Sequence, residues 1–223
     1  MTDRVRVAFF LSGSGTTLDN LLALVAAGQV PAEVVVVLAD RQGTKGIEKA
    51  KARGIPTVVV DRRGWRDQAA FDAAVAEAIR PHAADLVVMG GFLRLWHVPP
   101  EWRGRVLNVH PSLLPSFGGK GFYGERVHRA VIDAGVRVTG CTVHFVDDEY
   151  DHGPIVAQAA VLVEDRDTPD TLAHRVQEAE RRIYPACIRL FAEKRLRIEG
   201  QRVKVLPPPP APAGKGADRG FDG

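Results

Sequence analysis

The sequence has few cysteines and no long apolar segment, and both absences narrow what the protein can be. Only two of the 223 residues are cysteine, Cys141 and Cys187, and they stand far apart in otherwise apolar surroundings. Two such residues supply neither a disulfide framework nor a zinc motif. No apolar run reaches the roughly 20 residues that a helix needs to cross a bilayer. The sequence therefore predicts a protein without a membrane partner.

The N-terminus also lacks the pattern of a secretory signal. Residues 1–4 lead directly into an apolar stretch, and no small-residue cleavage site follows. The net charge is only +3 and the isoelectric point is about 9.0, with the arginines scattered along the chain. Such a distribution favours a small anionic substrate at least as much as nucleic acid. We therefore expect a cytoplasmic protein, and the sequence leaves open whether it forms a homodimer.

Apolar runs of strand length alternate with helical patterns in the first half of the chain. The expected strands are residues 5–11, 34–39, 57–60, 85–89 and 106–109, and the expected helices are 16–27, 46–53 and 67–82. The first four runs are nearly continuous in large aliphatic and aromatic residues, as in a parallel sheet that is buried on both faces. This alternation predicts a Rossmann-like, doubly wound α/β sheet that binds ligands at the carboxyl ends of its strands.

The second half of the chain has a different pattern. Residues 139–146 and 155–163 are expected to form an antiparallel pair, followed by a helix over 167–194 and a short hairpin over 197–205. The length suits a single domain, which we assign to residues 1–205. Residues 206–223 are rich in proline and glycine, and this composition is typical of a disordered tail.

A glycine-rich segment follows the first expected strand. Gly13 and Gly15 allow a tight turn, while backbone amides, the hydroxyls of Thr16 and Thr17 and the start of a helix suit a phosphate group. A nicotinamide dinucleotide site is an alternative, because Asp40 ends the second strand where a ribose-binding acid would lie. A tight turn with a helix cap and no ligand is the third interpretation.

Two polar residues end the fifth expected strand. Residues two apart in an extended chain face the same side, so Asn108 and His110 can converge on one ligand atom. An amide donor beside a protonatable imidazole suits a developing oxyanion. The alternative is that both side chains bind a neighbouring loop.

An acidic turn follows the strand that contains His144. A carboxylate from this turn could stabilise the charged form of His110 and raise its pKa. The residues alone do not choose among four acids, Asp147, Asp148, Glu149 and Asp151. His144 and His152 with these acids lack a recognised ligand spacing, so we expect no metal.

Four segments together resemble the phosphoribosylglycinamide formyltransferases, a branch of the folate-dependent formyl transferases. They are residues 12–18, 90–94, 107–115, and 142–145 with 151–155, they occur in family order, and the resemblance covers about residues 4–195. The run Asn-Val-His-Pro-Ser-Leu-Leu-Pro and the turn Asp-His-Gly-Pro carry the resemblance to the whole group. The first loop indicates the glycinamide branch.

The resemblance implies a reaction and a set of residues. The enzyme would transfer a formyl group from 10-formyltetrahydrofolate, as co-substrate, to the amine of phosphoribosylglycinamide in purine synthesis, without a metal. The implied catalytic residues are Asn108, His110 and Asp151, with His144 in support. Those implied to bind the substrate are Gly15, Thr16, Thr17 and Glu180, and those implied to bind folate are Leu93, Arg94, Leu95, Trp96 and Asn108.

The chain departs from the family pattern in three places, of which one is a loop over residues 96–101 that is shorter by about two residues. Residues 116–128 are longer and richer in glycine than the usual loop, and we expect them to form a lid. An arginine that many members direct at the folate aligns with Gln68, and Arg66 lies nearby, so that role stays unassigned. Two rivals in the family carry extra domains for which the chain has no room: methionyl-tRNA formyltransferase and formyltetrahydrofolate deformylase.

Overall fold

Buried apolar strands form the centre of the fold. The computed structural model describes residues 4–208, and within that range nine strands make one sheet in the order β3-β2-β1-β4-β5-β6-β7-β9-β8. β1 to β5 pair in parallel, whereas β6 pairs antiparallel with β5 and β7 antiparallel with β6. The predicted mixed α/β sheet with an antiparallel C-terminal part is confirmed.

The strands and helices have the following bounds. The strands are β1 Val5–Leu11, β2 Ala32–Ala39, β3 Thr57–Val59, β4 Leu86–Met89, β5 Val106–His110, β6 Val138–Phe145, β7 Ile155–Leu162, β8 Leu196–Glu199 and β9 Arg202–Val205. The helices are α1 Thr16–Ala26, α2 Lys45–Lys51, α3 Gln68–Ile79, α4 Glu125–Asp133 and α5 Pro169–Ala192, with short 3-10 turns at Arg62–Gly64, Arg80–His82 and Pro100–Trp102.

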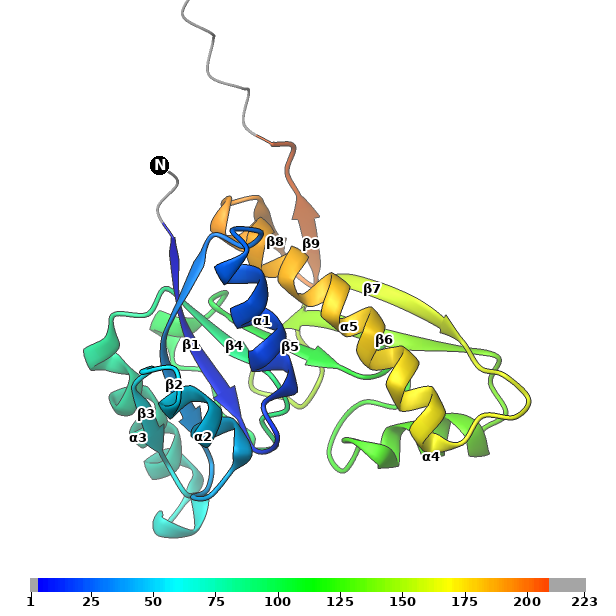
Figure 1. Ribbon diagram of the computed structural model, residues 1–223, viewed down its shortest axis with the longest axis horizontal. Helices are drawn as coiled ribbons and strands as arrows, with labels where there is room; N and C mark the ends of the chain where they lie inside the picture. Colours follow the sequence, from blue (N-terminus) through cyan, green and yellow to red (C-terminus); the bar gives the residue numbers. More distant parts are fainter. Residues whose placement is uncertain (1–3, 209–223) are drawn as a thin grey trace, which may run out of the picture.

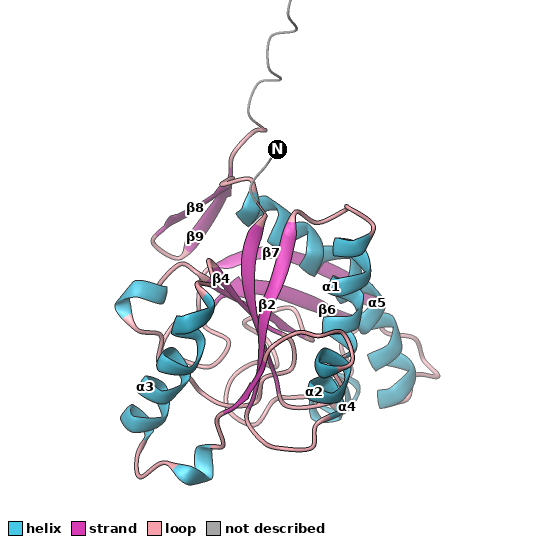
Figure 2. Cartoon of the chain, turned by 60° about the vertical axis from the view of Figure 1, so that its left-hand side comes forward, coloured by secondary structure: helices cyan, strands magenta, loops and turns pink. Residues whose placement is uncertain are grey.

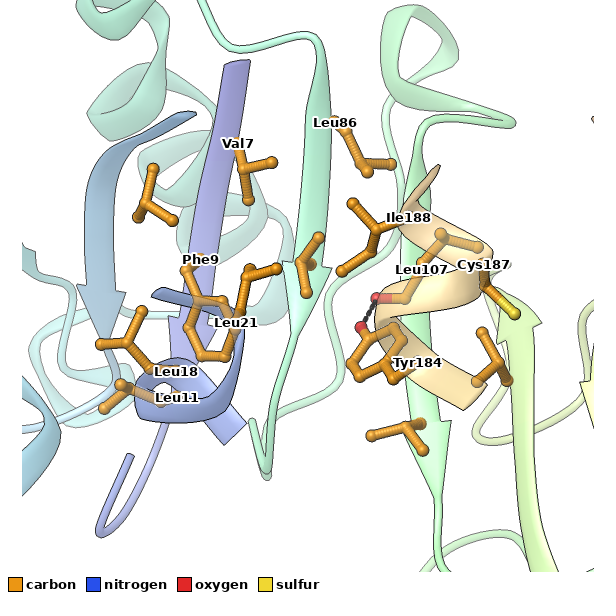
Figure 3. Packing of buried hydrophobic residues seen from close by; sticks show 14 of the residues in the cluster. Val7, Phe9, Leu11, Leu18, Leu21, Leu86, Leu107, Tyr184, Cys187 and Ile188 are labelled. Atoms are coloured by element: carbon orange, nitrogen blue, oxygen red, sulfur yellow. Dashed lines mark hydrogen bonds between the residues drawn. The ribbon is translucent and has the colours of Figure 1, made fainter. Parts of the chain in front are cut away.

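Helices cover both faces of the sheet and enclose two cores. Figure 2 shows α3 on one face and α1, α2, α4 and α5 on the other. The core under α3 includes Phe71, Val75 and Trp96. In the opposite core, α1 and α5 pack their apolar residues on β1, β4 and β5, and Tyr184 donates to the carbonyl of Leu107 at 2.8 Å (Figure 3).

Most expected boundaries lie within two residues of the observed ones. The expected helix over 67–82 ends earlier, at Ile79, and continues as a 3-10 turn. Pro81 lacks the N–H that would bond to the carbonyl of Glu77, so the regular helix stops there. α4 was not expected, and it lies beside the N-terminal part of α5 (Figure 1).

The C-terminal boundary differs slightly from the expected one. The backbone N–H of Leu206 donates to the carbonyl of Arg195 at 2.8 Å, so contacts with the domain continue past residue 205. Most of the predicted tail, residues 209–223, lies outside the described residues. Within residues 4–208, no helix is both long and apolar enough to cross a membrane.

Candidate active site

A cavity of about 540 Å³ opens at the carboxyl ends of β1, β4 and β5. The carboxyl ends of parallel strands meet at one edge of a sheet, so the loops that follow them share this space. Its walls are residues 13–17, 90–93, 108–111 and 119–124, together with His128, Tyr150, Asp151, Gln177 and Glu180. The structure therefore brings most of the residues expected at the site to one cavity.

Asn108 and His144 face each other across two strands. The β5–β6 register pairs them, and the Asn108 Nδ2 lies 3.1 Å from the His144 Nε2. The His144 Nδ1 is 2.8 Å from the carbonyl of Phe145, which can only accept, so Nδ1 carries the hydrogen and Nε2 accepts from Asn108. Burial lowers the pKa of His144, which favours this neutral ring. Asn108 keeps a second amide hydrogen for a ligand.

His110 is enclosed by two hydrogen-bond acceptors. Its Nε2 lies 2.9 Å from the carbonyl of Phe117, and its Nδ1 lies 3.3 Å from the Asp151 Oδ2. A carbonyl and an ionised carboxylate only accept, so this arrangement suits a ring that is protonated on both nitrogens. The ring is 3% exposed. A ligand oxygen can accept a hydrogen bond from the His110 Nε2 only if it shares that N–H with the Phe117 carbonyl or takes the place of the carbonyl.

Asp151 lies beside both histidines. Its Oδ2 accepts from the N–H of Gly119 at 2.9 Å, and its Oδ1 lies 3.8 Å from the His144 Nε2. Burial by itself would raise the pKa of Asp151, but the hydrogen bond and charge of His110, with the Gly119 N–H and a smaller effect of His144, outweigh it and lower that pKa. The carboxylate is therefore ionised near neutral pH.

The other three acids of the turn do not contact His110. Asp147 and Asp148 bind groups elsewhere, and Glu149 is exposed. Asp147 lies 2.7 Å from the His152 Nδ1, and Asp148 accepts from the N–H of Val98 at 3.1 Å. Of the four acids, Asp151 is the one on the cavity wall.

Backbone geometry fixes the position of Asp151. Its φ of 55° lies in the left-handed region, within the turn that follows β6. A Cβ on the nearby Gly153 would lie 2.0 Å from the Phe145 carbonyl oxygen, so only glycine fits there. The glycine of the Asp-His-Gly-Pro sequence is thus required for the shape of this turn.

The glycine-rich first loop presents uncapped helix amides. Gly15 has a φ of 70°, and a Cβ there would lie 2.7 Å from the Gly46 Cα, so α2 packs directly on the loop. No side chain caps α1, which argues against the interpretation of the loop as only a capped turn. Thr16 and Thr17 line the cavity at this positive helix end.

Glu180 lies on α5 and faces the same cavity. Its side chain is partly buried, and burial raises its pKa to about 7, although the charges of His110 and Arg181 oppose the change. Near neutral pH the carboxyl is therefore partly protonated, and it can accept or donate a hydrogen bond.

The resemblance implies that residues 93–96 bind folate largely through backbone groups, and most of their side chains lie outside the cavity. Of residues 93–96, only Leu93 lines the cavity. Arg94 pairs with Asp40 at 2.7 Å, and the Leu95 N–H donates to the Tyr150 hydroxyl at 3.1 Å. Trp96 is 1% exposed and packs in the core. Any contact of residues 94–96 with a ligand thus depends on backbone groups.

Gln68 supports this segment from α3. Its Nε2 donates to the carbonyl of Leu95 at 3.0 Å and to Asp72 at 2.7 Å. Arg66, with a side chain 91% exposed, pairs with Asp67. Neither residue lines the cavity.

Asp40 is not available to a dinucleotide ribose. Its side chain is 1% exposed and its Oδ2 is held by Arg94, and the residue is absent from the cavity wall. This observation weakens the nicotinamide dinucleotide alternative. Within residues 4–208, no three His, Cys, Asp or Glu side chains lie close enough to hold a metal ion together.

Several residues of the cavity were not predicted from the sequence, above all His128 on α4. His128 is 3% exposed and follows Val127, which packs in the core with Val131. Apolar residues at positions 127 and 131 have helical spacing, and this signal could have revealed α4. Tyr150 and Gln177 carried no comparable signal.

Comparison with known proteins identifies similar chains. The family model described as formyl transferase matches residues 5–188. The chain is 42% identical over 206 residues to the trifunctional purine biosynthetic protein adenosine-3 of Gallus gallus, covering 92% of this chain but 20% of that protein. The chain thus spans about a fifth of the length of such relatives. It is 33% identical to the phosphoribosylglycinamide formyltransferase of Haemophilus influenzae, covering 87% of this chain and 90% of that one.

A solved structure has the same fold. Glycinamide ribonucleotide transformylase 1 from Symbiobacterium toebii superposes with a TM-score of 0.86 at 42% identity. The match covers 93% of this chain and 96% of that one.

Proposed function

The chain belongs to the formyl transferase family, and from this membership we propose that it transfers the formyl group of 10-formyltetrahydrofolate to the amine of phosphoribosylglycinamide. The products are formylglycinamide ribonucleotide and tetrahydrofolate, in purine synthesis. One observation carries the proposal: Asn108, His110 and Asp151 line the same cavity as the first loop and Glu180. The wall with Asn108, His110 and Asp151 suits the transfer of an acyl group, and the wall with the first loop and Glu180 suits a phosphorylated sugar.

In this proposal the glycinamide amine attacks the formyl carbon, and negative charge develops on the formyl oxygen. The second amide hydrogen of Asn108 donates to that oxygen, and the charged ring of His110 stabilises it. A preorganised donor of this kind contributes about 3–4 kcal/mol to lowering the barrier. Asp151 keeps His110 charged and helps a proton pass from the attacking nitrogen to the departing one.

The acceptor side of the cavity supports phosphoribosylglycinamide. Gly15, Thr16 and Thr17 offer backbone amides and hydroxyls to the phosphate at the start of α1. The Glu180 carboxyl suits the ribose hydroxyls, because in its ionised form it accepts from both. The Leu93–Trp96 segment and Asn108 would bind the pterin ring of the folate.

The proposed reaction needs no metal, because the folate already carries the formyl group on a nitrogen that leaves. We propose that it takes place in the cytoplasm, on small-molecule substrates and without nucleic acid.

An absorbance assay for tetrahydrofolate release tests the proposal. Release that requires phosphoribosylglycinamide is expected. Release without that acceptor would instead indicate a deformylase, and no release under either condition would overturn the transferase assignment. Protection against heat unfolding by nicotinamide dinucleotide, but not by a folate analogue, would favour the dinucleotide alternative.

A further inference from the structure

His128 differs from the other two histidines of the cavity in its hydrogen bonding. It reaches the cavity from α4 and is 3% exposed. Its Nδ1 is buried and, among the described residues, has no hydrogen-bond partner. A buried polar atom without a partner is unfavourable, and His128 lines a ligand cavity, so the uncommitted ring points to a ligand.

The ring of His128 is also free to adopt either tautomer. In His110 and His144 both ring nitrogens lie near a protein donor or acceptor, which fixes where the hydrogens are. Among the described residues, His128 has no such contact. Burial and the nearby charge of His110 lower the pKa of His128, so the ring is neutral at neutral pH and has one lone pair to offer.

The proposed reaction leaves one group of the substrate in need of an acceptor. The formyl oxygen and the phosphate require donors, which Asn108 and the first loop supply. The attacking amine carries N–H groups that require an acceptor. The Asp151 Oδ2 already accepts from Gly119 and faces His110, whereas His128 has a ring nitrogen with no partner among the described residues.

We propose that His128 binds the substrate amine, accepting an N–H hydrogen bond through its uncommitted ring nitrogen and so directing the amine lone pair at the formyl carbon. This inference rests on the proposed function. Asn108 and His110 would stabilise the formyl oxygen, and His128 would recognise the acceptor amine.

A ligand that lacks the amine provides the test. Binding of phosphoribosylglycinamide and of its des-amino analogue, phosphoribosylacetamide, is measured by calorimetry on the full chain and on the variant His128→Phe. The native chain should prefer the amine by roughly five- to tenfold, the value of one hydrogen bond, and His128→Phe should lose that preference. His128→Asn, which keeps an acceptor, should retain part of it. His174→Asn on the exposed face of α5 is the matched control.

Acid pH gives a second readout. Lowering the pH protonates His128 and removes the lone pair that accepts from the amine. The preference for phosphoribosylglycinamide over phosphoribosylacetamide should therefore fall in the native chain but not in His128→Asn. Equal weakening of both ligands in His128→Phe, or an unchanged preference, would overturn the proposal. Folate-analogue binding verifies that the variants fold. If the native chain binds phosphoribosylglycinamide poorly and does not formylate it, the proposed function fails instead.

Discussion

At the scale of single residues, Asn108 and His110 would act on the formyl oxygen of the proposed reaction in different ways. Asn108 has an unused amide hydrogen, whereas His110 is held between Phe117 and Asp151 and, in the proposed mechanism, supplies mainly its charge. The sequence predicted their convergence from the period of a strand. It could not predict the Phe117 contact, because that contact depends on how residues 111–117 fold back.

Replacing either residue by alanine should lower kcat at least about a hundredfold, because each change removes stabilisation of the transition state. Steady-state kinetics on Asn108→Ala and His110→Ala measure the loss. The two residues act on one oxygen, so the double variant should lose less than the sum of the single effects in free energy. Near-normal turnover in either variant contradicts the proposed mechanism.

Asp151→Asn should move the basic limb of the pH–rate profile to lower pH, because the His110 imidazolium loses its counter-charge. The profile of kcat against pH measures this shift. Asp147→Asn is the control: it removes the same charge from the same turn, but its partner is the exposed His152. Equal shifts in both variants would indicate a general field effect and contradict a specific Asp151–His110 pair.

Glu180 should make folding stability depend on pH. Its pKa rises from the ordinary value of 4.5 to about 7 in the folded chain, so between these values the folded state binds more protons than the unfolded state. The free energy of unfolding therefore falls as pH rises from about 5 to 7. Glu180→Gln should be more stable than the native chain by about 1–3 kcal/mol at pH 8, but not at pH 4. Urea unfolding at both pH values measures this difference.

The matched control for this comparison is Glu178→Gln, an exposed glutamate on the same helix. It should change stability little at either pH. A gain at pH 8 that is as large in Glu178→Gln as in Glu180→Gln would show that burial is not the cause.

At the scale of elements, a hydrogen bond between α1 and α5 replaces a backbone hydrogen bond that α5 lacks at Pro185. Pro185 lies inside α5 and lacks the N–H that would bond to the carbonyl of Arg181. The side chain of Asn20 on α1 donates to that carbonyl at 3.1 Å. The bond connects the helix that follows the first loop to the helix that carries Glu180.

Asn20→Ala should lower the free energy of unfolding by about 0.5–1.5 kcal/mol, because the Arg181 carbonyl loses its donor. In a Pro185→Ala background the helix provides its own N–H, so the same change should cost less. Urea unfolding of the four variants of this cycle tests the coupling. Purely additive losses would mean that Asn20 acts through other contacts.

The sequence predicted elements better than contacts between them. The helix expected over residues 167–194 is α5, and the apolar runs identified β1, β2 and β4. The pairing of Asn108 with His144 could not be predicted, because hydrophobic alternation leaves the β5–β6 register open. The Trp96 side chain lies in the core, and local sequence does not show which side of a loop is covered, so folate binding by the backbone of residues 93–96 stays a prediction.

At the scale of the whole molecule, the two cores and the cavity lie within residues 4–208. Residues 209–223 belong to the proline- and glycine-rich segment that the sequence predicts to be a disordered tail, so their removal should leave Tm and KM unchanged. A second truncation, after Arg195, removes the β8–β9 hairpin, which pairs with β7 and packs Val203 on the core. Thermal unfolding should show a lower Tm for the second truncation only. A large loss in the first would contradict the predicted domain boundary.

The two sides of the cavity come from different elements. Formyl transfer would depend on β5, β6 and the turn that carries Asp151, whereas acceptor recognition would depend on the first loop, one face of α5 and, in our proposal, His128 of α4. Mutations in one set need not disturb the other. An evolving lineage could therefore exchange the acceptor molecule while it inherits the formyl chemistry intact, and protein engineers who seek new formylated products can restrict their libraries to residues 13–17 and to positions 128, 177 and 180.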